Sequence, residues 1–178
     1  MRRRISKLWA AVISGVFITF VQASSASATS FTFVTIDHPD TTQSLGTNLT
    51  GINNLGAVVG LYGDFGGSPL IIHAFTLASD YSTFVSADIL DATRTVTWSI
   101  NDAGNIVGAS WAPDHQGFVR SNDGSSVTFL DVPGSNAGTT TATGINASDV
   151  IVGYSKSGSH FTLHAFIRLP DGASSPKK

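Results

Sequence analysis

One nine-residue phrase occurs three times in this chain, and it limits the folds that the chain can adopt more than any other feature. The copies are INNLGAVVG at 52–60, INDAGNIVG at 100–108 and INASDVIVG at 145–153, and they align without a gap. Their first residues are 48 and 45 positions apart. A period in this range is typical of repeat architectures such as propellers, in which each repeat is one supersecondary unit.

Each copy begins with a turn signal. An asparagine side chain can accept a hydrogen bond from the backbone two residues on and so begin a tight turn. Three residues later the chain has glycine or aspartate, which tolerate the left-handed conformation that ends such a turn. The paired positions are Asn53 and Gly56, Asn101 and Gly104, and Asn146 and Asp149. We therefore expect three hairpins at these places.

The strand after each turn is apolar on both faces. Its central residues are Val58 and Val59, Ile106 and Val107, and Ile151 and Val152. Successive side chains of a strand point to opposite faces, so a strand of this kind must lie between two layers. The glycine that follows permits a close approach of neighbouring backbone; it is Gly60, Gly108 or Gly153. Blades stacked face to face would produce this pattern.

Two further strand-like stretches accompany each copy. The later ones are HAFTLAS at 73–79, HQGFVRS at 115–121 and HAFIRLP at 164–170, and the earlier ones are FTFVTID at 31–37, SADILD at 86–91 and VTFLDV at 127–132. We predict an all-β domain over 29–172 with about twelve strands, in three four-stranded, β-propeller-like units near 31–81, 84–124 and 127–172. A β-trefoil-like three-fold closure is the alternative. It is less favoured because trefoil strands need not be apolar on both faces.

The combination of GIN-x-x-G-x-VVG with HAF, and with DVPG at 131–134, resembles the HAF-repeat family of probable extracellular repeat proteins. The resemblance extends from about Phe31 to Gly172. It implies export and a propeller-like all-β repeat, and it implies no activity. The second unit departs from the pattern, with Ser99 in place of glycine, HQGF in place of HAF, and Asp91 followed by no proline two residues later.

The first 28 residues have the layout of a secretory signal peptide. Arg2, Arg3, Arg4 and Lys7 precede an apolar run at 8–21, and small residues at Ala26 and Ala28 form a cleavage pattern. The run is shorter than the roughly 20 residues that a spanning helix needs, although an uncleaved anchor is the alternative. Arg2 and Arg3 resemble a twin-arginine signal, but Ser6 interrupts the apolar pair, which favours ordinary export. We expect a secreted or periplasmic protein cleaved near Ala28, with a disordered tail at 173–178.

Composition excludes several classes of function. Removing the leader leaves six cationic side chains against twelve aspartates, a formal charge of −6. An acidic surface without a basic stripe disfavours nucleic acid and anionic membrane as partners. The chain has no cysteine, which excludes thiolate metal sites and a cysteine nucleophile. It also lacks nucleotide-binding, zinc-protease, hydrolase and calcium-loop motifs, so no cofactor or metal is expected.

Two sets of polar residues recur in the three units. Their residue types are common in catalytic sites, but the recurrence itself favours a structural role. His73, His115 and His164 stand at the start of the later strands, and Asp37, Asp91 and Asp131 follow an apolar residue at the end of the earlier ones. Histidine is the commonest base and metal ligand, and paired carboxylates can do acid–base chemistry. Equivalent positions in a ring of repeats are spread around its axis, however, so we interpret all six as structural.

The connections before the later strands differ between units, at 62–72, 110–114 and 154–163, and they carry aromatic residues. Variable loops on a rigid repeat are where binding usually evolves. Aromatic rings there can stack on sugars or insert into a protein, although capping of the core is as good an explanation. The candidate ligand-binding residues are Phe65, Trp111, Tyr154 and Phe161.

Three functions remain open. The sequence favours a non-catalytic binding or adhesion module for an extracellular glycan or protein; a self-assembling structural unit and a lyase or hydrolase with a site in a propeller funnel are the alternatives. Known propellers have four to eight blades, and the phrase occurs only three times. The three units could close alone, belong to a longer repeat protein or associate, and we favour a homodimer that completes a ring.

Overall fold

The computed structural model describes residues 30–41, 46–64, 71–111 and 114–170. The chain divides into two compact units, Met1–Val34 and Thr35–Lys178. Of the first unit the described residues are 30–34, which have no regular secondary structure. The predicted leader at 1–28 and the predicted tail at 173–178 lie outside the described residues and stay predictions.

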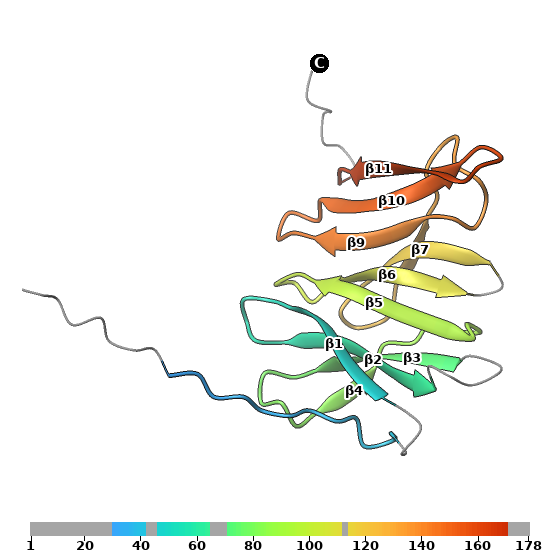
Figure 1. Cartoon of the computed structure of the whole chain (residues 1–178). Helices are drawn as coiled ribbons and strands as arrows, with labels where there is room; N and C mark the ends of the chain where they lie inside the picture. Colours follow the sequence, from blue (N-terminus) through green and yellow to red (C-terminus); the bar gives the residue numbers. More distant parts are fainter. Residues whose placement is uncertain (1–29, 42–45, 65–70, 112–113, 171–178) are drawn as a thin grey trace, which may run out of the picture. The chain divides into compact units, whose positions relative to one another are not determined.

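The described part of the second unit is all-β, as predicted (Figure 1). It contains eleven strands and no helix. The strands are β1 (Gly46–Ile52), β2 (Val58–Asp64), β3 (Ile71–Leu77), β4 (Phe84–Ser86), β5 (Arg94–Ile100), β6 (Ile106–Trp111), β7 (His115–Arg120), β8 (Val127–Leu130), β9 (Thr141–Ile145), β10 (Ile151–Ser157) and β11 (Thr162–Arg168).

The strands form two sheets, and neither closes into a barrel. The larger sheet has the order β1-β2-β3-β5-β6-β7-β8, with β4 paired to β3, and the smaller has the order β11-β10-β9. Every pairing is antiparallel except a single parallel bridge between Ile72 of β3 and Arg94 of β5. Among the described residues, this bridge is the only strand pairing that joins β1–β4 to β5–β8 in the larger sheet. We therefore call β1–β4, β5–β8 and β9–β11 the first, second and third set.

The three asparagine turns share one geometry. In each, the backbone N–H of the asparagine donates to the carbonyl four residues later at 3.0–3.1 Å. The backbone N–H of the residue three positions after the asparagine donates to the asparagine carbonyl. The asparagine Oδ1 also accepts backbone N–H groups of its own turn. Gly56 and Gly104 both have φ of +82°, and Asp149 has φ of +56°. This is the left-handed conformation that the turn chemistry predicts.

Each set also has one β-bulge at a corresponding place. The extra residue is Thr50 in β1, Trp98 in β5 and Thr143 in β9. Opposite it lies the glycine that ends the repeated phrase, where an added Cβ would overlap a main-chain oxygen of the preceding strand and a phenylalanine ring of the following one. The glycines are Gly60, Gly108 and Gly153, and the rings are Phe75, Phe118 and Phe166. Each bulge thus requires glycine as its neighbour.

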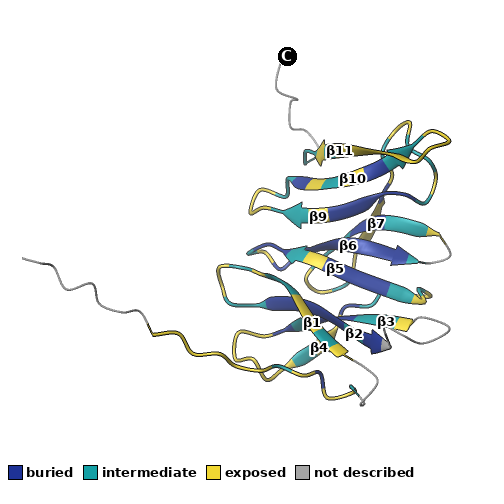
Figure 2. Cartoon of the chain, viewed as in Figure 1, coloured by how far each residue is buried: buried dark blue, intermediate teal, exposed yellow. Residues whose placement is uncertain are grey.

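Adjacent residues of β2, and likewise of β6, enter different apolar clusters. Val58 packs with Phe75 and Leu77 on one side of β2, whereas Val59 belongs to the cluster that joins the first and second sets. Ile106 lies in that same cluster, and Val107 in the one that joins the second and third sets. Figure 2 shows this burial along the middle strands and the exposure of β11. Full burial of such a side chain stabilises the fold by roughly 1.5–3 kcal/mol.

The strand expected at 31–37 is absent from the described residues, and this part of the prediction is wrong. The chain instead contributes a side chain, because Ile36 packs against the cluster of Val58, Phe75 and Leu77. A tight turn follows at once, in which the N–H of Thr41 donates to the carbonyl of His38 at 3.0 Å. The apolar pattern was therefore a sign of burial at one residue and not of a paired strand.

Candidate functional site

The ends of β2, β6 and β10 and the starts of β3, β7 and β11 lie at one edge of the second unit, which we call the loop edge (Figure 1). The three asparagine turns lie at the opposite edge, the turn edge. The turn edge repeats one geometry, whereas the loop edge joins strand ends by segments of different length. This edge also carries the histidine side chains of each set, so it is the candidate functional site.

In the first set a row of stacked rings lies at the loop edge. The imidazole of His38 lies parallel to the ring of Tyr62 with centroids 3.7 Å apart, and Tyr62 stacks on His73 at 5.1 Å. The Nδ1 of His73 is 2.8 Å from Oδ2 of Asp88. The other oxygen of Asp88 accepts the backbone N–H of Ala74 at 2.7 Å. The carboxylate therefore fixes the orientation of the His73 ring.

Burial favours the neutral forms within this row. It lowers the pKa of His38, against the opposing effect of the Asp40 carboxylate. It also raises the pKa of Tyr62, and the charge of Asp40 acts in the same direction. An oriented histidine–aspartate pair is part of a nucleophilic triad, but within the described ranges no hydroxyl lies against the second ring nitrogen of His73. The row can bind through ring faces and hydrogen bonds.

In the second set the ring of Trp111 is already in contact with its neighbours. His115 stacks on it at 4.4 Å with an interplanar angle of 4°, and the guanidinium of Arg94 lies 5.5 Å from the ring centroid. These residues pair with Trp111 from the strands on either side. Burial lowers the pKa of His115, and the charge of Lys156 adds to this effect. The faces of Trp111 are therefore less available to a ligand than the sequence suggests.

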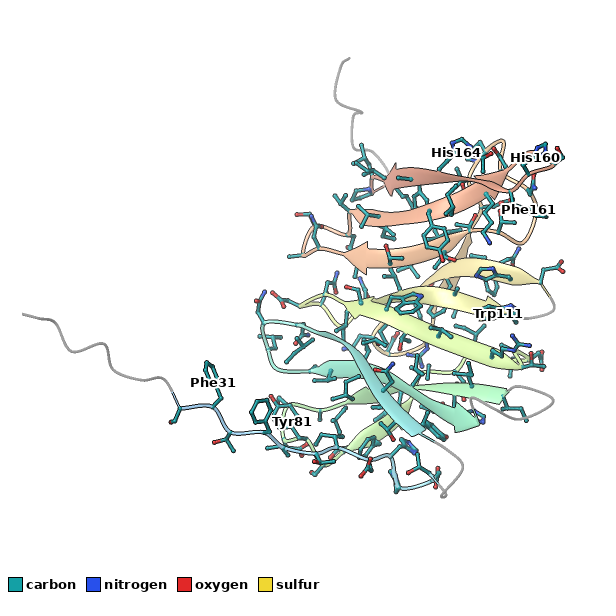
Figure 3. All side chains as sticks on the ribbon, viewed as in Figure 1. Phe31, Tyr81, Trp111, His160, Phe161 and His164 are labelled. Atoms are coloured by element: carbon teal, nitrogen blue, oxygen red, sulfur yellow. The ribbon has the colours of Figure 1, made fainter. Side chains whose placement is uncertain are left out.

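In the third set Phe161 stands at the tip of the β10–β11 hairpin, beside His160 (Figure 3). Its side chain is 58% exposed, and its backbone has φ of +51°. The Nε2 of His164 lies 2.9 Å from the hydroxyl of Ser157, which links the two strands next to the turn. A left-handed conformation is uncommon for a bulky residue, and such strain often marks functional positions.

The structure does not bring the four predicted aromatic residues together. Phe65 lies outside the described residues. Tyr154 belongs to the middle of β10, opposite Ala165, and not to a connection as the sequence suggested. Trp111 ends β6, and Phe161 is in the β10–β11 turn. Only Trp111 and Phe161 therefore lie at the loop edge within the described part of the chain.

The three recurrent histidines are not equivalent in register, contrary to the sequence interpretation. His73 pairs with Tyr62 and His164 with Ser155, each two residues beyond the glycine of its phrase. The corresponding residue of the second set is Gln116, because HQGF contains one residue more than HAF. His115 therefore projects to the opposite face, where its Nε2 lies 3.2 Å from the hydroxyl of Thr141.

The recurrent aspartates do not form a paired site among the described residues. Asp91 has φ of +62° in the connection after β4, and Asp131 accepts a hydrogen bond from Ser135 at 3.4 Å. The carboxylate that contacts a candidate residue is Asp88, which sequence reasoning passed over. Asp88 lies in SADILD, three residues before Asp91, and nothing in that stretch marks it as a partner of His73. Its contact with His73 is long-range and leaves no local pattern.

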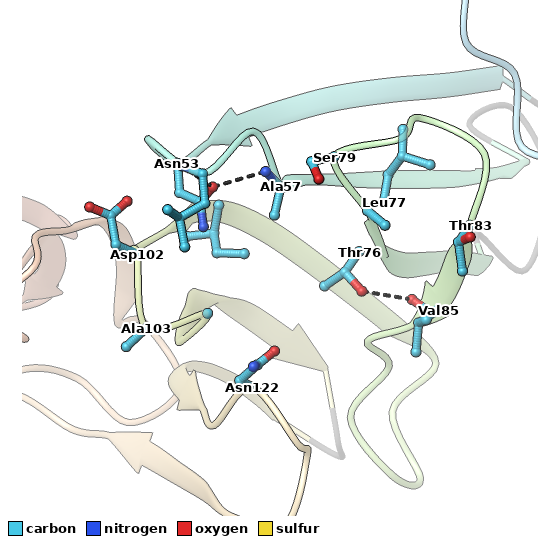
Figure 4. Close-up of a pocket in the computed structure, with 14 residues that line it drawn as sticks. Asn53, Ala57, Thr76, Leu77, Ser79, Thr83, Val85, Asp102, Ala103 and Asn122 are labelled. Carbon is cyan, nitrogen blue, oxygen red and sulfur yellow. Dashed lines mark hydrogen bonds between the residues drawn. The ribbon is translucent and has the colours of Figure 1, made fainter.

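A hollow of about 350 Å³ lies at the turn edge (Figure 4). Leu77 and Val85 supply apolar lining, and Asn53, Asp102 and Asn122 supply polar groups. The Oδ1 of Asn53 accepts the N–H of Ala57 at 2.9 Å, so this group is already bonded within its turn. Hydrogen bonds from the Asn54 side chain and backbone lower the pKa of Asp102. These polar groups serve the turns, which makes the hollow the weaker candidate.

The part of the chain that the structure describes has no cluster of three or more residues suited to hold a metal ion. It likewise contains no helix with the length and apolarity to cross a bilayer. No protein-family model, curated protein or solved structure matches this chain.

Proposed function

We propose that this chain is a secreted, non-catalytic repeat protein that binds an extracellular glycan or protein through its loop edge. The observation that carries the proposal is the difference between the two edges. The turn edge repeats one hydrogen-bonded geometry three times, while the loop edge carries connections that differ in each set. A rigid scaffold with one variable edge is the arrangement in which binding surfaces usually arise.

The scaffold in this proposal is a run of three β-propeller-like units of the HAF-repeat type. The corresponding bulges at Thr50, Trp98 and Thr143 support a structural repeat. The division of adjacent apolar residues between two clusters supports stacking of the units. The open sheets favour a propeller-like arrangement over a trefoil, whose core is a closed barrel.

Export is supported by the charged and apolar start of the sequence and by the small residues before Thr29. A chain without cysteine can fold in an oxidising compartment without forming disulfides. Its predicted negative charge after cleavage keeps it soluble and disfavours adsorption to nucleic acid.

Phe161 is the residue through which we expect contact. An exposed aromatic ring can stack on the apolar face of a sugar or enter a pocket of a protein. Phe161 lies at the tip of the hairpin, and its backbone has the left-handed conformation. The neighbouring His160 ring and Ser159 hydroxyl, 3.2 Å apart, add hydrogen-bonding groups beside it.

Binding of the purified chain to arrays of glycans and of surface proteins tests the proposal. Phe161→Ala should weaken the binding of any ligand found by at least about tenfold, the effect of losing one buried aromatic contact. Tyr81→Ala is the matched control, because Tyr81 is also an exposed aromatic residue in a turn with positive φ, +55°, and lies away from the loop edge. Equal losses in the two variants, or binding that neither affects, would contradict the proposal.

A further inference from the structure

The third set ends in an apolar sheet face that nothing in the described part of the chain covers. Ile151 is buried against the second set, so Val152 points to the other side of β10. Tyr154 shares that side, and their partners on β11 are Ile167 and Ala165. Val152 is 43% exposed and Ile167 is 70% exposed. We call this surface of β10 and β11 the rear face.

The same face is buried in the two earlier sets. Val59 and Val107 correspond to Val152 in the repeated phrase, and both have 0% exposure. Val59 packs against the second set and Val107 against the third. Ala74, which corresponds to Ala165 of the HAF strand, is also fully buried. The rear face therefore corresponds to a surface that is buried in the first and second sets, where the next set packs against it.

The first set has a face of the opposite kind that is only partly covered. Ile36 and the His38 ring pack beside Val58 and Phe75, whereas the β1 side of this face is open. Ile52 pairs directly with Val58 and shares its face, but Ile52 is 63% exposed. The corresponding Ile100 is only 6% exposed, because the first set covers it. Leu49, Ile52 and Val58 line a hollow of about 330 Å³ on this side. We call this surface of β1 and β2 the front face.

A ladder of asparagine side chains crosses the interfaces between the sets. The Nδ2 of Asn53 donates to the carbonyl of Asn101 at 3.0 Å, and the Nδ2 of Asn101 donates to the carbonyl of Asn146 at 3.1 Å. Among the described residues the Nδ2 of Asn146 has no acceptor. At the other end, the carbonyl of Asn53 accepts, within the described part of the chain, only the N–H of Gly56 from its own turn. One end thus offers a donor and the other an acceptor.

We propose that a second copy of this chain docks head to tail, so that the rear face of one copy covers the front face of the other. The contact continues the packing already present between the sets, and Asn146 donates to the carbonyl of Asn53 in the second copy. Two copies bring together six sets, which falls within the four to eight blades that propellers use. Each copy then uses both of its ends, and the assembly closes as a ring instead of growing into a filament.

Sedimentation velocity of the full chain, as recovered from expressing cells, should show a dimer. Val152→Asp on the rear face and Ile52→Asp on the front face should each give monomers, because both place a charge in the contact. Both residues are exposed within one copy, so the variants should keep the circular dichroism spectrum of the parent. Leu90→Asp is the control, because Leu90 is 86% exposed and lies in the connection after β4, on neither end face.

Mixing the two monomeric variants distinguishes head-to-tail contact from other arrangements. The unchanged rear face of Ile52→Asp can meet the unchanged front face of Val152→Asp, so the mixture should form a heterodimer through one native contact. A rear-to-rear dimer predicts instead that Ile52→Asp alone remains dimeric and that mixing restores nothing. Asn146→Asp keeps the acceptor oxygens of the turn and removes the donor, and it should raise the dimer dissociation constant by at least about tenfold. A monomeric parent chain, an open polymer, or an unchanged dimer in either aspartate variant would overturn the proposal.

Discussion

The side-chain amide of Asn53 donates a hydrogen bond to the main-chain carbonyl of Asn101, the residue 48 positions later, at 3.0 Å. One residue type therefore holds its own turn through Oδ1 and the next turn through Nδ2. The repeat in the sequence is thus also a chain of contacts in space. This dual use predicts that the buried asparagine in the middle of the ladder matters most to stability.

Asn101→Ala should lower the free energy of unfolding by about 2–4 kcal/mol, because Asn101 is 3% exposed and its side chain bonds Asn105, Asn146 and Asp149. Urea denaturation followed by tryptophan fluorescence measures the change. Asn54→Ala removes only the exposed bond from its Nδ2 to Oδ2 of Asp102 and keeps the one from its backbone N–H, so it should cost no more than about 0.5 kcal/mol. Equal losses in the two variants would show that the ladder does not stabilise the fold.

Gly108→Ala should lower the free energy of unfolding by about 3 kcal/mol, since the new methyl group would overlap the carbonyl oxygen of Val96 and the ring of Phe118. Gly134→Ala provides the comparison. It has nothing within 4 Å of the added atom but a φ of +83°, so it should cost about 1 kcal/mol through the backbone alone. Differential scanning calorimetry of both variants would refute the crowding argument if their losses were the same.

Stability should fall as the pH is lowered from about 6.5. Burial lowers the pKa of His38 and His115 below the ordinary value of 6.5, so the unfolded chain binds more protons than the folded one in this window. Stability is therefore full above pH 6.5 and declines until the folded-state pKa values are reached. Chemical denaturation at several pH values measures the slope. His115→Gln should make it shallower, and an unchanged slope would remove His115 from this account.

Phe161→Gly should raise the free energy of unfolding by about 0.5–1 kcal/mol, because glycine adopts a φ of +51° without the strain that a phenylalanine incurs. The ring is 58% exposed, so little packing is lost. Thermal unfolding of the variant checks the sign. A lower melting temperature would mean that the ring packs on the hairpin, and would weaken its assignment to ligand contact.

The exported form should begin at Thr29. The charged start, the apolar run and the small residues up to Ala28 predict cleavage at this bond. Edman sequencing or intact mass measurement of protein from the culture medium or periplasm identifies the first residue. Protein that starts at Met1 and stays with the membrane fraction would show that the segment is an anchor.

Local chemistry made the turns predictable. Asn53 and Gly56 bond and bend within a few residues, so their side chains report their own backbone conformation. The burial of Val58 and Val59 on opposite faces of their strand was predictable for a similar reason, because adjacent strand residues point to opposite sides. Both features depend on residues that are close together in the sequence, so the sequence alone predicts them.

Contacts between distant residues were not predictable in the same way. The pairing of Asp88 with His73 depends on how β4 and the segment after it fold back on β3. The offset of His115 could have been found by counting back from Phe118 instead of aligning the histidines. Ile36 was misjudged because an apolar residue looks the same whether it enters a strand ladder or packs singly.

The separation of the two edges has a consequence for protein engineering. Pairing of β10 with β11 is continuous from Ile151–Arg168 to Ser157–Thr162, and the turn that fixes the register of β9 and β10 lies at the far edge. A peptide spliced between Gly158 and Phe161 would therefore leave strand register untouched. Each doubling of such a loop costs only about 0.6 kcal/mol in closure entropy. The hairpin tip is thus a natural place to display foreign sequences, as a small cysteine-free carrier.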